Sequence, residues 1–172
     1  TDMEEDWILY SPSVMYSVSL LIRLLSQPHD KVLTMNPMYD AFINVIKEND
    51  RELLSHHLIK EKGTFKIDFD VFEKQAQEST LLLLCAPHNP TGRIWSDEEM
   101  RRMIEICKKY QVKIISDEIH MDIRIKDAKH HPLMKYYGEY KDIFTASSSS
   151  KTLNTPGLIG SYVIIPDEKI RD

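Results

Sequence analysis

The run Leu81–Cys85 (LLLLC) constrains the fold of this 172-residue chain more than any other segment. It is apolar without alternation, which is the pattern of a strand covered on both faces in a parallel sheet. Residues 87–92 (PHNPTG) follow, and prolines and glycine at this spacing continue neither a strand nor a helix. The run therefore predicts a central strand that ends in a loop.

Helical and extended patterns alternate along the rest of the chain. Apolar spacing predicts helices at about 13–26, 39–48, 71–77 and 96–110. Short apolar runs predict strands at 31–35, 112–116, 143–146 and 162–165, with further extended pieces on either side of Gly63. We expect Asp70 to cap one helix, and Ser96 with Glu99 to form a capping box. The order predicts one α/β domain, a three-layer α/β/α sandwich with a mostly parallel sheet.

The composition argues against some classes of binding partner. Hydrophobic residues make up 42% of the chain and charged residues 28%, which is typical of a globular domain. The net charge is −5 and the Lys and Arg residues are scattered, which argues against a nucleic-acid partner. No apolar stretch approaches the roughly 20 residues that span a bilayer, and no signal peptide is visible, so we expect no membrane partner and a cytoplasmic location. Cys85 and Cys107 lie in apolar runs and are interpreted as reduced, buried thiols.

Polar residues cluster just past the predicted strands. In a parallel α/β sheet, ligands bind at the carboxyl ends of the strands, so we expect these side chains in one cleft. They are Tyr39, Asn89, Asp117, Glu118, His120, Ser148 and Lys151, with the helix start at Ser13 nearby. Each also has a purely structural interpretation: a core aromatic, a turn former, a helix cap, a buried histidine or a solvated lysine.

Four strings in order carry a resemblance to a known family. They are residues 37–42 (PMYDAF), 89–92 (NPTG), 116–122 (SDEIHMD) and 148–152 (SSSKT). Together they resemble the fold-type I pyridoxal-phosphate enzymes of the aminotransferase class I/II superfamily, over essentially the whole chain. The SDEIHMD string, the GRIW of residues 92–95 and the PSVMY of residues 12–16 favour the MalY/PatB-type carbon–sulfur β-lyases (cystathionine β-lyases).

The resemblance implies a cofactor, pyridoxal 5′-phosphate, and a role for each residue. Lys151 matches the lysine that forms an imine with the cofactor, which requires the neutral amine. Asp117 matches the acid at the pyridine nitrogen, Asn89 the amide at the ring 3′-oxygen, and Tyr39 the stacking aromatic. Ser148 and the N–H groups of Ser13 and Val14 match phosphate ligands, since helix N-termini suit a dianion. His120 stands where many aminotransferases have tyrosine, and its role stays open.

Three functional hypotheses remain. The first is a lyase that eliminates a thiol from cystathionine- or cysteine-type amino acids and yields pyruvate and ammonia, with Lys151 moving the α-proton. The second is an aminotransferase, which would use the same residues. The third is a catalytically incomplete fragment, because family members are longer and work as homodimers with shared active sites. Under all three hypotheses, the resemblance implies that residues 1–172 are the central part of the cofactor-binding large domain, and that the C-terminal small domain with the substrate-carboxylate arginine is absent.

Two histidine pairs suggest metal binding at first sight. They are His56-His57 and His130-His131. Adjacent histidines rarely chelate one ion together. We therefore expect no metal site.

Overall fold

A mostly parallel sheet forms the centre of the molecule, and the computed structural model describes residues 3–123 and 128–172. The sheet order is β1-β9-β8-β7-β6-β2-β3. Its strands are β1 (Ile8–Ser11), β2 (Lys31–Asn36), β3 (Glu52–His57), β6 (Leu81–Cys85), β7 (Lys113–Asp117), β8 (Ile143–Ser147) and β9 (Ser161–Ile164). Within this sheet, the neighbours among β3, β2, β6, β7 and β8 pair in parallel. The pairs β8–β9 and β9–β1 are antiparallel.

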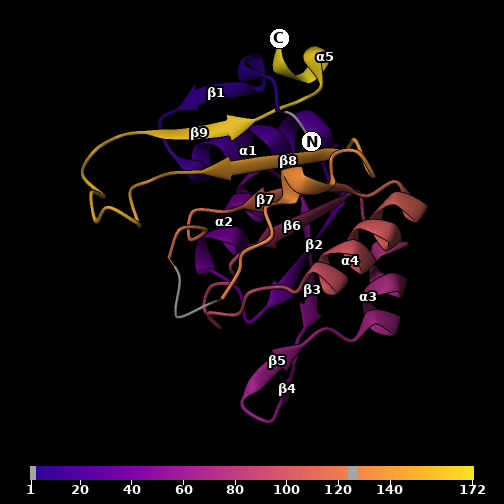
Figure 1. The fold of residues 1–172 in the computed structure, drawn as a ribbon. Coiled ribbons are helices and arrows are strands. Elements are labelled where there is room, and N and C mark those ends of the chain that lie inside the picture. Colours follow the sequence, from indigo (N-terminus) through magenta and orange to yellow (C-terminus); the bar gives the residue numbers. More distant parts are fainter. Residues whose placement is uncertain (1–2, 124–127) are drawn as a thin grey trace.

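Helices cover both faces of this sheet. One face packs against α1 (Val14–Leu25) and α2 (Asp40–Glu48). The other packs against α3 (Phe69–Ala76), α4 (Asp97–Tyr110) and the 3-10 turn η2 (Leu133–Tyr136). Figure 1 shows α3 and α4 together on one side of the strands. The predicted α/β sandwich with a mostly parallel sheet is confirmed.

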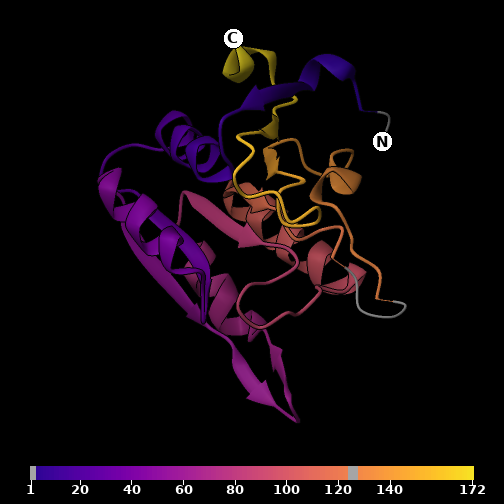
Figure 2. The same cartoon turned by 90° about the vertical axis from the view of Figure 1, so that its left-hand side faces the viewer.

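Short elements complete the described chain. A 3-10 turn η1 (Glu5–Trp7) precedes β1, and a helix α5 (Glu168–Arg171) follows β9. The strands β4 (Ile59–Glu61) and β5 (Thr64–Lys66) form a hairpin that projects away from the body of the molecule (Figures 1 and 2). In the described part of the chain, no helix has both the length and the apolar character needed to cross a membrane.

The position of β6 between two covered faces of the sheet explains why its sequence does not alternate. Leu81, Leu83 and Cys85 pack into the cluster beneath α1 and α2. Leu82 and Leu84 pack into the cluster beneath α3 and α4. All five residues are at most 4% exposed. Because full burial of one leucine contributes about 1.5–3 kcal/mol, this strand is a major source of stability on both faces.

The predicted N-terminal cap is present at α4 but differs at α3. Ser96 and Glu99 form the predicted capping box at α4. The expected cap at Asp70 is wrong: the Asp68 carboxylate accepts the N–H groups of Asp70 and Val71, so α3 begins at Phe69. Asp70 instead lies in the first turn, where its charge suits the positive end of the helix dipole.

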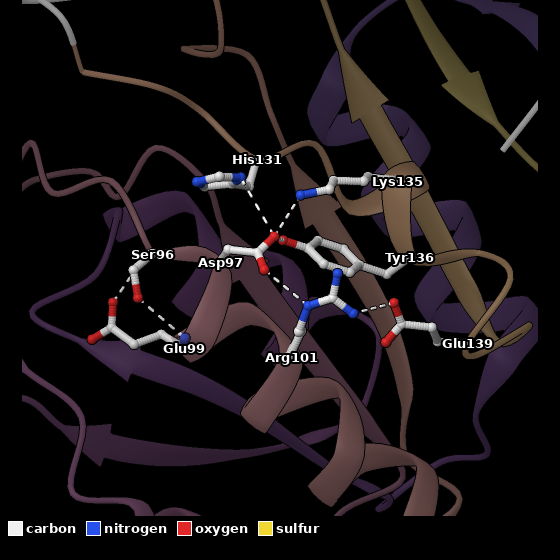
Figure 3. Close-up of polar contacts among 8 residues, drawn as sticks. All are labelled: Ser96, Asp97, Glu99, Arg101, His131, Lys135, Tyr136 and Glu139. Carbon is white, nitrogen blue, oxygen red and sulfur yellow. Dashed lines mark hydrogen bonds and ion pairs between the residues drawn. The ribbon is translucent and has the colours of Figure 1, made fainter.

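A polar network fastens η2 to the start of α4 (Figure 3). The Asp97 carboxylate accepts from Tyr136 Oη at 2.8 Å and from Arg101 Nε at 2.8 Å, and it pairs with Lys135. Arg101 also pairs with Glu139. Lys135 and Arg101 hold the pKa of Asp97 well below its ordinary value, so the carboxylate keeps its charge. The network fixes the segment that leads into β8.

Candidate functional site

A cavity of about 490 Å³ lies at the carboxyl ends of the parallel strands. Residues at or just beyond the ends of β2, β6, β7 and β8 line it, together with the first turn of α1. Eight of the residues singled out from the sequence lie on its wall: Ser13, Val14, Tyr39, Asn89, Asp117, His120, Ser148 and Lys151. The structure therefore brings these eight together, while their chemical roles stay predictions. The expectation for Glu118 is wrong, because it lines a separate cavity.

Asp117 supplies a buried carboxyl to the cavity. It is the last residue of β7, one position later than the predicted strand end, and is 4% exposed. Burial raises its pKa to about 6, and the neighbouring charge of Glu118 adds to the rise. The N–H of Ile119, which donates to Oδ1 at 3.1 Å, and the charge of Lys151 act in the opposite direction. A cationic group inside the cavity would stabilise this carboxylate.

Lys151 and Ser148 come from the loop after β8. Lys151 is exposed and lines the cavity with Asp117 and His120. Its charge opposes the effect of burial on the pKa of Asp117 and adds to the effect of burial on the pKa of His120. The Ser148 hydroxyl donates to the Gly160 carbonyl at 2.7 Å and accepts from the Ser150 N–H at 3.1 Å. Ser148 therefore ties the two ends of this loop together, and its proton already has an acceptor.

The start of α1 gives the cavity an electropositive end. Ser13 is the N-cap, and its Oγ accepts the Tyr16 N–H at 3.1 Å. The first N–H groups of a helix have no acceptor within the helix, and Val14 and Met15 line the cavity. Free N–H groups and the positive end of the helix dipole suit an anion such as a phosphate.

Asn89, Tyr39 and His120 complete the wall. Asn89 follows β6 and donates its backbone N–H to Cys85 Sγ at 3.4 Å. Tyr39 is 42% exposed, so it is not a core aromatic, and its ring meets Phe42 edge-on at 5.9 Å. Burial and the charge of Lys151 lower the pKa of His120, which leaves its imidazole uncharged at neutral pH. Asn89 and His120 also line a second cavity of about 260 Å³.

Two features of the cavity were not anticipated from the sequence. Cys85 is a free, buried thiol as expected, yet it also lines the cavity. Burial raises its pKa to about 12, so the thiol stays protonated. Leu158 and Ile159 line the cavity too, although they are 71% and 77% exposed. An apolar pair between Gly157 and Gly160 was the available signal.

The arrangement fits one kind of ligand. It offers a primary amine, a buried carboxyl, an amide, a half-exposed aromatic ring and the N-terminus of a helix around one space. This donor set complements a flat ring with a cationic nitrogen, a carbonyl group and an anionic substituent. Among residues 3–123 and 128–172, no group of three or more His, Cys, Asp and Glu side chains is placed to hold a metal ion.

A family model and a curated relative match the chain. The family model for aminotransferase class I and II matches residues 2–172. The chain is 36% identical over 163 residues to the cystathionine beta-lyase PatB of Bacillus subtilis (strain 168), covering 93% of this chain and 42% of PatB.

Two solved structures also match nearly the whole chain. A PLP-bound C-S lyase from Staphylococcus hominis is 32% identical with a TM-score of 0.95, over 99% of this chain and 44% of that one. A PLP-bound putative aminotransferase from Clostridium difficile 630 is 40% identical with a TM-score of 0.94, over 98% and 44%. The chain thus spans less than half the length of these relatives.

Proposed function

The chain belongs to the aminotransferase class I and II family, and on that premise we propose that it is the central part of the large domain of a pyridoxal-phosphate-dependent carbon–sulfur β-lyase. One observation carries the proposal: Lys151, Asp117 and the N-terminus of α1 line the same cavity. The similarity to PatB and to the Staphylococcus hominis C-S lyase favours the lyase reaction.

The described residues fit pyridoxal phosphate. The α1 N-terminus at Ser13 and Val14 would hold the phosphate, and Ser148 would contribute chiefly by shaping the adjacent loop, because its proton bonds Gly160. Asp117 would pair with the ring nitrogen, and a cationic partner there would offset the burial that raises its pKa. When bound, the cofactor supplies an electron sink for carbanion chemistry.

Asn89 and Tyr39 would position the ring, the first through its amide and the second by stacking on a face. His120 is uncharged at neutral pH and lies between the two cavities. We propose that it borders the space for the substrate side chain.

Lys151 would do the proton chemistry. Its amine would hold the cofactor at rest and, with an amino-acid substrate bound, would remove the α-proton as a general base. The bond between the β-carbon and sulfur then breaks with its electron pair on sulfur, and a proton gives the free thiol. Addition of water and loss of ammonia leave pyruvate.

An aminotransferase is the second candidate, because the Clostridium difficile protein is the more identical of the two structures. The two reactions differ in the fate of the nitrogen. We would supply cystathionine to the purified full-length enzyme and measure pyruvate and ammonia without a keto-acid acceptor. Release of both supports the lyase. Amino exchange that needs a keto acid, without pyruvate from cystathionine, would refute it.

The whole enzyme extends beyond this chain in our proposal. We propose a cytoplasmic homodimer whose substrate-carboxylate arginine and small domain lie outside residues 1–172, because the relatives are more than twice as long as the matched segment. The chain alone should then bind the cofactor but turn over substrate poorly. Adding pyridoxal phosphate to it should produce the visible absorbance of the lysine-bound cofactor. If no such band appears, the chain is an incomplete fragment that does not hold the cofactor.

A further inference from the structure

Glu118 is a buried carboxylate directly behind the candidate site. It is 1% exposed and follows Asp117, but it does not line the same cavity. Successive side chains of an extended segment point to opposite sides, and Glu118 lines a separate apolar cavity with Thr145 and Tyr162. A carboxylate in such surroundings is retained only when its oxygens are bonded.

The Glu118 carboxylate is bonded at both oxygens. Oε1 accepts the Leu133 N–H at 2.8 Å and the Ser116 hydroxyl at 3.1 Å. Oε2 meets Nε2 of His130 at 3.2 Å, and both side chains are almost fully buried. The side chain therefore links the end of β7 to the segment that enters η2.

The backbone of Glu118 makes a second link, to β8. Its N–H donates to the Ala146 carbonyl at 2.9 Å, and its carbonyl accepts the Ser147 hydroxyl at 3.1 Å. β8 ends at Ser147, only four residues before Lys151. Glu118 thus follows the acid of the cavity and bonds to the end of the strand that precedes the loop with Lys151.

We propose that Glu118, braced by His130 and the Leu133 N–H, is a positioning residue that holds Asp117 and Lys151 at the spacing the cofactor requires. The inference rests on the proposed function, since the spacing matters only if both groups engage one ligand. Glu118 acts through Asp117 and β8 and does not touch the ligand itself. At metal sites, residues that orient a ligand from behind change affinity by about 10- to 100-fold when mutated, and we use this as the scale for Glu118.

The test compares two substitutions that remove the same charge. Glu118→Gln keeps the length of the side chain, with an oxygen for Leu133 N–H and an NH₂ that can donate to His130 Nε2. Glu118→Ala removes the side-chain bonds to Leu133, Ser116 and His130 and keeps the backbone bonds to β8. Glu105→Gln is the matched control, an exposed carboxylate on α4. We would measure the dissociation constant of pyridoxal phosphate from the absorbance of the bound cofactor.

We expect Glu118→Ala to weaken cofactor binding by about 10-fold or more, and Glu118→Gln and Glu105→Gln to remain close to the unsubstituted chain. Equal affinities for the Ala and Gln variants, whether both kept or both lost, would overturn the proposal. If Glu118→Ala does not fold, His130→Ala removes the contact between His130 and the Glu118 carboxylate and leaves Glu118 in place. That variant must then bind the cofactor more weakly than Glu105→Gln does.

A second readout needs no cofactor. The pKa of the Asp117 carboxyl can be followed by carbon NMR in the cofactor-free chain. Both Glu118 variants lose one negative charge, so a difference between them reports displacement of the strand end. We expect the lower pKa in Glu118→Ala, because water admitted at the gap stabilises the carboxylate. If the unsubstituted chain binds no cofactor, it is an incomplete fragment, and equal Asp117 pKa values in the two variants would still reject the positioning role.

Discussion

The raised pKa of Asp117 predicts that removing this carboxylate stabilises the cofactor-free protein. Its pKa is about 6 in the folded chain against an ordinary value of 3.8, and burial is the main cause. Between these values the folded state binds more protons than the unfolded state. The free energy of unfolding therefore falls as the pH rises from about 4 to about 6, and stays lowered above that.

The magnitude follows from the size of the shift. The rise is about two pKa units, and one unit corresponds to about 1.36 kcal/mol, so ionised Asp117 lowers the stability of the cofactor-free fold by up to about 3 kcal/mol at pH 7. Asp117→Asn cannot ionise, and its amide oxygen can still accept the Ile119 N–H. The variant should therefore be more stable than the unsubstituted chain at pH 7.5, with an advantage that shrinks towards pH 4.

Urea unfolding of both cofactor-free proteins at pH 4 and pH 7.5 measures this difference. Other titrating groups cancel when the two proteins are compared at one pH. An Asn variant that is less stable at pH 7.5, or a difference that does not change with pH, would contradict a raised pKa of Asp117. With pyridoxal phosphate added, the order should reverse, because the bound ligand stabilises only a protein that holds it.

Three further predictions test other parts of the account. Lys151→Ala should abolish the absorbance band of the lysine-bound cofactor, and leave the melting temperature of the cofactor-free chain nearly unchanged because Lys151 is exposed. Leu83→Ala should destabilise the fold by about 2–5 kcal/mol in urea unfolding, since Leu83 is 0% exposed, whereas Leu24→Ala at a 61% exposed position should have little effect. Ser96→Ala removes the α4 cap and should lower the free energy of unfolding by about 1 kcal/mol; no loss in the same assay would contradict the assigned cap.

The central part of the fold was predictable because local signals there agree with the long-range packing. The unalternating run of β6 indicates two covered faces, and Ser96 with Glu99 marks the start of α4. Strand β1 was missed because it is short and its partner β9 lies about 150 residues later, where Ser161 Oγ donates to the Ser11 carbonyl. No local pattern encodes such a pairing.

The candidate site was predictable in its residues but not in its hydrogen bonds. Strand ends and motifs placed Asp117 and Lys151 at one edge of the sheet, and both line the cavity. The bond from Ser148 to Gly160 spans a loop whose path the sequence does not specify. The bonds of Glu118 depend on the arrival of Leu133 from η2, so its motif alone left its role open.

Covalent trapping of the cofactor identifies the lysine that holds it. The chain would be incubated with pyridoxal phosphate, reduced with borohydride, digested, and mapped by mass spectrometry. We expect one pyridoxyl group, carried by the peptide with Lys151, and a much weaker signal in Asp117→Asn. A label spread over other lysines, or a single label on a lysine outside the cavity, would contradict the proposed role of Lys151.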